Sequence, residues 1–198
     1  MSLEEFSGVH TYIQQVEDVL YSKIFKDPAS GYRKYLNVDS FISWYMVNEI
    51  TKNQDARLWS SIYTYYNPET GLLYRGPVWD FDIALGNIDY SNCDDPEGFW
   101  IKTGPWYDRL FKDPWFIQEL QQAWKQHLPF LQELPADIRQ RAGELSAAQK
   151  HNFLVWDILD NYVWPNAVVT GSYQGEIDYL TEWLQRRIDW LDTAIRDL

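Results

Sequence analysis

Two aspartates two residues apart give the segment Pro77–Asp82 the clearest potential for chemistry in the chain. In an extended backbone, residues two apart lie on one face with roughly 6–7 Å between their Cα atoms, so Asp80 and Asp82 can converge on one cation or on two adjacent cations. Trp79 and Phe81 would then anchor the opposite face in the core. Hard carboxylate oxygens favour magnesium or calcium, and magnesium is favoured if phosphates complete the shell. Alternatively, one aspartate caps a turn and the other is simply exposed.

Asp55 is the third candidate for chemistry. It follows the end of an expected helix in the string Thr51–Asp55, where a side chain can project into a cleft. A carboxylate there can accept a proton from an attacking hydroxyl, or it can cap the next turn. The histidines at positions 10, 127 and 151 have no partner at metal-ligand spacing, so we expect surface or core positions for them. No serine has a nucleophile-elbow context, and the sequence contains no glycine-rich phosphate loop.

The elements that must position these aspartates are mostly helical. Apolar residues at three- and four-residue steps predict helices over 2–25, 39–53, 113–127, a short one from 135, 146–164 and 172–197. The second of these should carry Asn48, Thr51, Lys52 and Asp55 on its polar face. Strand-forming residues over 62–66 and 72–74, separated by the turn 67–71, predict a β-hairpin, and the alternation continues over 78–83. Residues 86–104 form a long acidic loop without periodicity. The sequence therefore predicts a mainly α fold with a small β-hairpin, in the α+β class.

Composition limits the possible functions. The 198 residues are 45% hydrophobic and 17% aromatic, which indicates an ordered globular domain. A net charge of −12 argues against nucleic-acid binding and suits cations, a basic partner or simply a soluble surface. The single cysteine, Cys93, excludes an internal disulfide. No stretch approaches the ~18 apolar residues of a membrane span, and no signal peptide is evident. Tryptophans on apolar helical faces (Trp44, Trp124, Trp156 and Trp183) favour core packing over a sugar-stacking platform.

Several motifs, taken in order along the chain, resemble the spore-coat protein H (CotH) kinase family. They are Val38–Phe41, Asn48-Glu49, Asn53, Asp55, Gly76–Asp82, Gly86-Asn87, Leu110–Pro114, Glu176-Ile177, Trp183-Leu184 and Arg187. The similarity covers almost the whole chain. The Trp-Asp-Phe-Asp string with its upstream Asn-x-Asp is fairly specific, whereas each piece alone would be weak.

The resemblance implies the C-terminal lobe of an atypical protein-kinase-like fold that transfers phosphate from ATP to Ser/Thr hydroxyls with Mg²⁺. Asp55 then matches the catalytic-loop aspartate, Asp80 matches the metal-binding aspartate, and Asp82 assists at the metal. Asn53 and Ser60 are the expected cofactor-binding residues. Ser60 stands where ordinary kinases have a metal-binding asparagine, about five residues after the catalytic aspartate, and serine is the poorer ligand.

The resemblance also gives expectations for the whole protein. Residues 1–35 contain neither a glycine-rich strand-turn-strand nor a strand-borne lysine, so we expect 1–198 to form a single lobe of a longer protein. The expected partners are the missing ATP-covering lobe and a protein substrate or coat or surface protein, in an exported or cell-envelope setting. Two alternatives remain: a non-catalytic surface or spore-coat scaffold, and a glycoside hydrolase with carboxylates roughly 5–9.5 Å apart.

Overall fold

The computed structural model describes residues 3–57 and 60–198, and 53% of the chain is helical. The elements in chain order are α1 (Leu3–Leu20), the 3-10 helix η1 (Tyr32–Lys34), α2 (Val38–Thr51), β1 (Thr64–Asn67), β2 (Leu72–Arg75), α3 (Tyr107–Leu110), α4 (Pro114–Glu144), α5 (Ser146–Val155) and α6 (Tyr173–Arg196). The predicted class, mainly α with a small hairpin, is confirmed. The predicted start of the first helix, at residue 2, lies outside the described residues.

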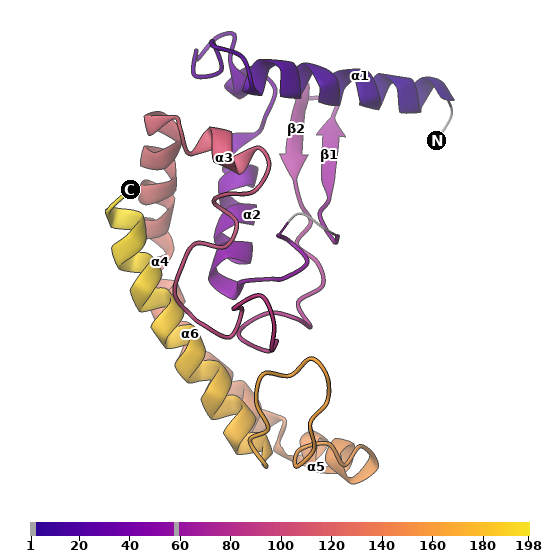
Figure 1. Ribbon diagram of the computed structural model, residues 1–198, viewed down its shortest axis with the longest axis vertical. Helices are drawn as coiled ribbons and strands as arrows, with labels where there is room; N and C mark the ends of the chain where they lie inside the picture. Colours follow the sequence, from indigo (N-terminus) through magenta and orange to yellow (C-terminus); the bar gives the residue numbers. More distant parts are fainter. Residues whose placement is uncertain (1–2, 58–59) are drawn as a thin grey trace.

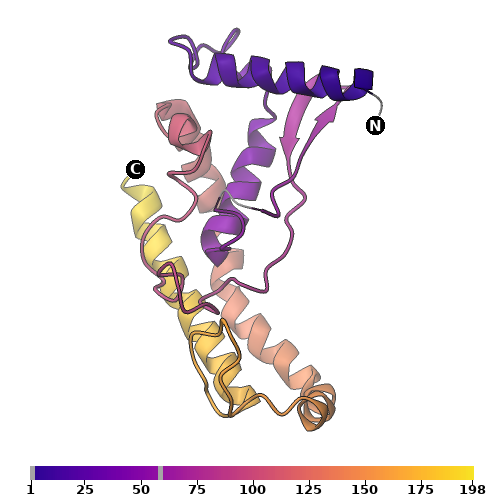
Figure 2. The same cartoon turned by 45° about the vertical axis from the view of Figure 1, so that its right-hand side comes forward.

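Helix α2 is the centre of the molecule. Figures 1 and 2 show it between the long α4–α6 pair on one side and the β-hairpin on the other. Its apolar residues point all round, and Phe41, Trp44 and Tyr45 are all buried. A helix that is apolar on every face is typical of a core element. Helix α2 begins one residue before the predicted 39, because the Asn37 side chain caps it by accepting a hydrogen bond from the Ser40 amide.

Helices α4 and α6 pack side by side over most of their length (Figure 1). Trp124 of α4 is buried at their contact, and its indole N–H donates to the Asp192 carboxylate of α6 at 3.1 Å. Asp113 caps α4 and Ser172 caps α6, at the positions where the sequence predicts these two helices to begin. The prediction that α4 ends near His127 and a new helix starts at Pro135 is wrong. The helix continues through Pro129 and Pro135. Each proline removes one backbone hydrogen-bond donor, but the packing of α4 against α6 continues past both and keeps the helix intact.

The predicted hairpin is present, with Thr64 opposite Arg75 and Asn67 opposite Leu72 in an antiparallel pair. Helix α1 lies across it (Figure 1), and the Tyr12 hydroxyl donates to the Gly71 carbonyl at 2.8 Å. The loop 86–104 contains no helix or strand, as expected. Helix α1 ends at Leu20, before the predicted 25, and α5 ends at Val155, before the predicted 164.

Residues 78–83 do not form the predicted extended strand. Asp80 has a φ of 62°, in the left-handed region, so the backbone reverses there and the two-residue alternation is lost. Trp79 is 57% exposed and cannot anchor the segment in the core, whereas Phe81 is half-buried. Asp80 and Asp82 therefore do not share one face of a strand.

Among the described residues, no helix is both long and apolar enough to cross a bilayer.

Candidate active site

The C-terminal end of α2 directs the chain toward the candidate site. Lys52 has a φ of 45° and its amide bonds back to the last turn of the helix, so the helix ends there and Asn53 leaves at an angle. Two backbone bonds then hold the 81–85 turn beside this exit: Gln54 N–H to the Ile83 carbonyl at 3.1 Å, and Leu85 N–H to the Thr51 carbonyl at 2.7 Å. The segments that carry Asp55 and Asp80 are thereby held next to each other.

Asn53 links these two segments through its side chain. It is fully buried, and its amide nitrogen donates to the Asp80 carbonyl at 2.9 Å and the Trp79 carbonyl at 3.3 Å. Its amide oxygen accepts from the Asp55 N–H at 3.2 Å. The Trp100 indole in turn donates to the Asn53 carbonyl at 2.9 Å. One side chain therefore fixes the backbone at both aspartates.

The carboxylates of Asp55 and Asp80 meet at the hydroxyl of Ser61. The Ser61 oxygen lies 3.4 Å from Asp55 Oδ2 and 3.2 Å from Asp80 Oδ2, so these two carboxylate oxygens are no farther apart than the sum of the two distances. Within residues 3–57 and 60–198, neither aspartate forms an ion pair. Two adjacent carboxylates without a basic partner are a site to which a cation is attracted.

Ser60, the expected cofactor-binding residue, lies beside this pair. Its amide N–H donates to the Asp55 carbonyl at 3.3 Å and its side chain is exposed. The residue that touches both aspartates through its hydroxyl is the next one, Ser61. The sequence signal that could have pointed to Ser61 is the Ser60-Ser61 doublet. Both serines lie about five residues after Asp55, where ordinary kinases have the metal-binding asparagine.

Asp82 is exposed and, among the described residues, does not share the hydrogen bonds of Ser61 with Asp55 and Asp80. Its backbone carbonyl accepts from the Asn87 side chain at 3.2 Å. No group of three or more His, Cys, Asp or Glu side chains in the described part of the chain is arranged to hold a metal ion. The structure thus brings together Asp55 and Asp80, and it does not add Asp82 to them.

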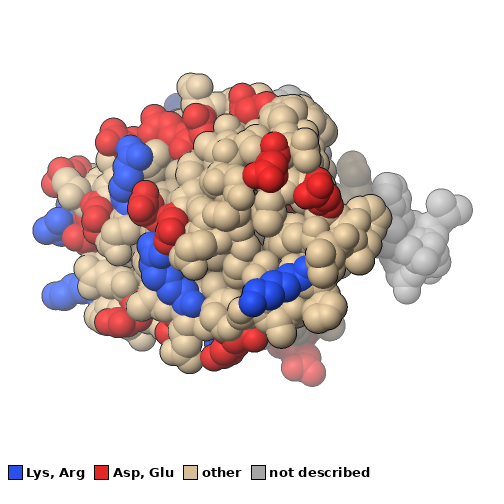
Figure 3. Space-filling view, turned by 90° about the horizontal axis from the view of Figure 1, so that it is seen from below, with Lys and Arg blue, Asp and Glu red and all other residues tan. Residues whose placement is uncertain are grey.

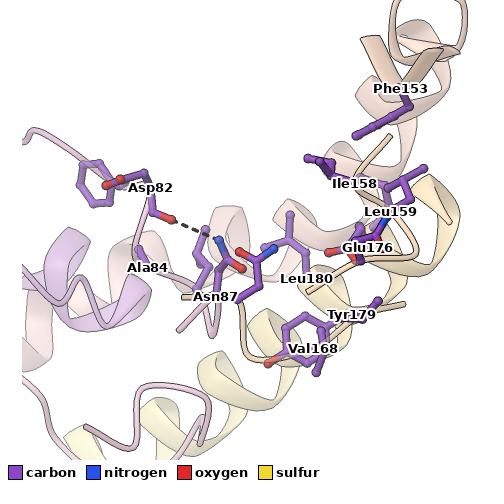
Figure 4. Close-up of a pocket in the computed structure, with 16 residues that line it drawn as sticks. Asp82, Ala84, Asn87, Phe153, Ile158, Leu159, Val168, Glu176, Tyr179 and Leu180 are labelled. Carbon is purple, nitrogen blue, oxygen red and sulfur yellow. Dashed lines mark hydrogen bonds between the residues drawn. The ribbon is translucent and has the colours of Figure 1, made fainter. Parts of the chain in front are cut away.

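A cavity of about 360 Å³ begins at Phe81 and Asp82 and extends to α6. Figure 4 shows Asp82 on one side, Glu176 and Leu180 on the other, and Asn87 between them. Its walls combine aliphatic and aromatic side chains with carboxylates and amides, and none of the described residues that line it is Lys, Arg or His. A molecule bound in this cavity would lie next to Asp82.

The segment between α5 and α6 forms one wall of this cavity and is fastened to the 86–104 loop. Tyr90 stacks on Trp164 with ring centroids 6.2 Å apart, and the Asp89 N–H donates to the Pro165 carbonyl at 2.9 Å. The Tyr162 hydroxyl donates to the Asp89 carboxylate. Burial, with nearby negative charge that includes Asp55, raises the pKa of Tyr90, which therefore stays a neutral phenol beside the site.

Two buried cations hold the 86–104 loop in place. Arg187 of α6 forms an ion pair with Glu49 of α2 at 2.7 Å, and it also donates to the Pro96 and Gly98 carbonyls, each at 2.7 Å. The Glu49 carboxylate accepts in addition from the Trp100 and Ile101 amides. The Glu49 and Arg187 side chains are both fully buried, so each charge depends on the other for compensation.

Lys52 is the second buried cation. Its ammonium donates to the Asp95 carbonyl at 2.6 Å and the Asn92 carbonyl at 3.3 Å. Burial lowers its pKa. Nearby, burial raises the pKa of the Cys93 thiol to about 12. The expected polar face of α2 is therefore largely inside the protein, since Lys52 and Asn48 are both buried.

Figure 3 shows acidic and basic side chains interspersed on the visible face of the molecule, with uncharged residues between them. The three histidines are exposed, in keeping with the surface positions allowed for them. Trp44, Trp124 and Trp183 are buried as predicted, whereas Trp156 is 63% exposed, and its predicted core position is wrong because α5 ends before it.

A sequence model described as CotH kinase protein matches residues 3–191 of the chain. The chain belongs to the CotH kinase family. No match was found among curated proteins. Asp55 and Asp80 of this CotH kinase family member both lie within the matched residues.

Proposed function

We propose that this chain carries the phosphoryl-transfer site of a kinase-like enzyme that uses ATP and Mg²⁺ to phosphorylate protein Ser/Thr hydroxyls. The observation that supports it most is the meeting of the Asp55 and Asp80 carboxylates at Ser61 in a CotH kinase family member. Phosphoryl transfer needs positioning and compensation of negative charge more than covalent chemistry from the protein. Two fixed carboxylates are suited to both tasks.

The donor set fits a hard divalent cation. Asp80 and Asp55 place carboxylate oxygens around one hydroxyl, and neither forms an ion pair within residues 3–57 and 60–198. Carboxylate oxygen is the ligand type that Mg²⁺ prefers. Asp80 would hold the cation, and Mg²⁺ supplies compensation for the charge of the transferred phosphate. The two carboxylates leave most of an octahedral shell to phosphate oxygens and water, as is usual for Mg²⁺ in nucleotide sites.

Asp55 would orient the acceptor hydroxyl and take its proton. Its main chain is held by two hydrogen bonds: its N–H donates to the Asn53 side chain, and its carbonyl accepts from the Ser60 amide. The Asp55 carboxylate therefore has little freedom to move away from Asp80. In this proposal Asn53 positions both aspartates and does not touch the nucleotide, because its side chain is buried and bonded to backbone.

Calorimetric titration of Mg-ATP into the full-length polypeptide tests the proposal. We expect Asp80→Asn to weaken binding at least tenfold, and Asp94→Asn to leave it unchanged, since Asp94 is an equally acidic, exposed residue outside the pair. Asp55→Asn should retain nucleotide binding and lose ADP release in the presence of a Ser/Thr acceptor. Absence of Mg-ATP binding by the unmodified protein would remove the kinase proposal and favour the scaffold alternative.

A further inference from the structure

We infer that Ser61, and not Ser60, supplies the third protein oxygen to the cation at the Asp55–Asp80 pair. This inference rests on the proposed function and names a ligand for it. Counting five residues from the catalytic aspartate, as in ordinary kinases, points to Ser60. The structure gives Ser61 the contact with both carboxylates and leaves the Ser60 hydroxyl without a contact to either.

The spacing of the three oxygens suits a shared cation. Neighbouring ligands of an octahedral Mg²⁺ at 2.0–2.1 Å stand about 3.0 Å apart, and those of Ca²⁺ stand about 3.4 Å apart. The Ser61 oxygen lies 3.4 Å from Asp55 Oδ2 and 3.2 Å from Asp80 Oδ2. The distances from the Ser61 oxygen to each carboxylate are therefore close to those between neighbouring ligands of one cation.

The hydrogen bonding of Ser61 leads to the same conclusion. A hydroxyl has a single proton and can donate it to one carboxylate at a time, so two acceptors compete for one donor at this position. A cation that binds both carboxylates and the hydroxyl oxygen satisfies all three groups together. The Ser61 hydroxyl would then bind the cation through an oxygen lone pair.

The backbone of Ser61 sets this position. Its φ is 55°, in the left-handed region, which turns the chain sharply between the Asp55 segment and β1. The preceding amide, that of Ser60, is bonded to the Asp55 carbonyl at 3.3 Å. Ser61 is half-buried and Ser60 is exposed, so the two adjacent hydroxyls have different surroundings and can be tested against each other.

The experiment measures Mn²⁺ binding to the full-length polypeptide by the electron paramagnetic resonance signal of free Mn²⁺, which shares the octahedral oxygen preference of Mg²⁺. Ser61→Gly removes the hydroxyl and keeps the left-handed backbone without strain. We expect it to weaken Mn²⁺ binding about tenfold, whereas Ser60→Gly changes it less than about twofold. Ser61→Asn should restore binding, because asparagine tolerates this φ and presents a carbonyl oxygen.

The unfolding temperature of each variant shows that it is folded at the temperature of the titration. If Ser61→Gly binds Mn²⁺ as tightly as the unmodified protein, or if Ser60→Gly loses binding in its place, the assignment to Ser61 is overturned while the kinase proposal stands. If the unmodified protein binds neither Mn²⁺ nor Mg-ATP, both proposals fail.

Discussion

Asn53 shows how one buried side chain can serve two functional residues. Its amide group is bonded to the backbone of Asp55 on one side and of Asp80 on the other. If it is lost, both backbone groups lose this partner in a partly buried setting, and a fully buried polar group that loses its partner costs about 1–3 kcal/mol.

We therefore expect Asn53→Ala to lower the free energy of unfolding by roughly 2–3 kcal/mol. The same change should weaken Mg-ATP binding, because the two carboxylates are no longer held together. Asn87→Ala is the matched control, since Asn87 is exposed and makes one bond, to the Asp82 carbonyl. It should change stability by less than about 0.5 kcal/mol in urea unfolding. Equal effects of the two substitutions would refute the positioning role.

The residue types of the site could be predicted from the sequence, but their arrangement could not. Asp55 and Asp80 stand out because their chemistry suits a cation and because their strings resemble a family. Their meeting depends on the left-handed backbone at Lys52 and at Asp80, which pattern and propensity do not reveal. The same backbone conformation at Asp80 invalidated the prediction of a strand over 78–83. Ser61 escaped notice because its role depends on that geometry.

At the scale of elements, the Glu49–Arg187 pair joins α2, α6 and the 86–104 loop. Both side chains are fully buried, and removal of one partner leaves the other charge uncompensated. Breaking such a pair commonly costs about 3–5 kcal/mol.

We expect Arg187→Ala to lower the free energy of unfolding by about 3–5 kcal/mol. Arg187→Lys should recover part of this loss, because a lysine keeps the charge but cannot reproduce the forked set of bonds to Glu49, Pro96 and Gly98. The neighbouring Arg186 is exposed, and Arg186→Ala should change the free energy of unfolding by less than about 0.5 kcal/mol. The midpoints of urea unfolding of the three variants test this prediction. An unchanged midpoint for Arg187→Ala would show that the Glu49–Arg187 pair does not stabilise the fold.

Element existence was easier to predict than element length. Sequence patterns predict that α4 begins at Asp113 and α6 at Ser172, where short polar side chains cap the helices. It failed at Pro129 and Pro135, because proline usually ends a helix and no local signal tells that packing against α6 continues. Tertiary contact overruled local propensity there.

At the scale of the whole molecule, the core is unusually rich in phenols. Tyr32, Tyr45 and Tyr107 are fully buried, and burial raises the pKa of each. The pKa of Tyr12 is raised to about 12, like that of the Cys93 thiol, with burial as the main cause in each case. All five groups are held neutral in the folded protein.

The sign of the pH dependence follows from these shifts. A group whose folded pKa lies above its unfolded value contributes full stability below the unfolded pKa and loses it as pH rises through the folded pKa. Unfolded cysteine and tyrosine ionise near about 8.5 and 10. We therefore expect the free energy of unfolding to change little through these groups up to about pH 8, and then to fall between about pH 9 and 12.

Absorbance of tyrosinate at 295 nm, followed together with far-ultraviolet circular dichroism, tests this dependence. The buried phenols should ionise only when the helical signal is lost, whereas all should titrate near pH 10 in concentrated guanidinium. The net charge of −12 also destabilises the protein at alkaline pH, so the tyrosinate signal is the discriminating measurement. Full ionisation near pH 10 with an intact helical signal would contradict the prediction.

The fastening of the 86–104 loop has a consequence for how this protein can evolve. Lys52 and Arg187 donate hydrogen bonds to the backbone carbonyls of residues 92, 95, 96 and 98. Because every amino acid has a backbone carbonyl, these bonds do not require a particular side chain. The exposed side chain of Asp95 is therefore not what this attachment depends on, whereas the left-handed backbone at Asn92 and Gly98, with φ of 57° and 82°, restricts replacement there. Substitutions at position 95 can therefore change the surface of the loop while the loop keeps its course.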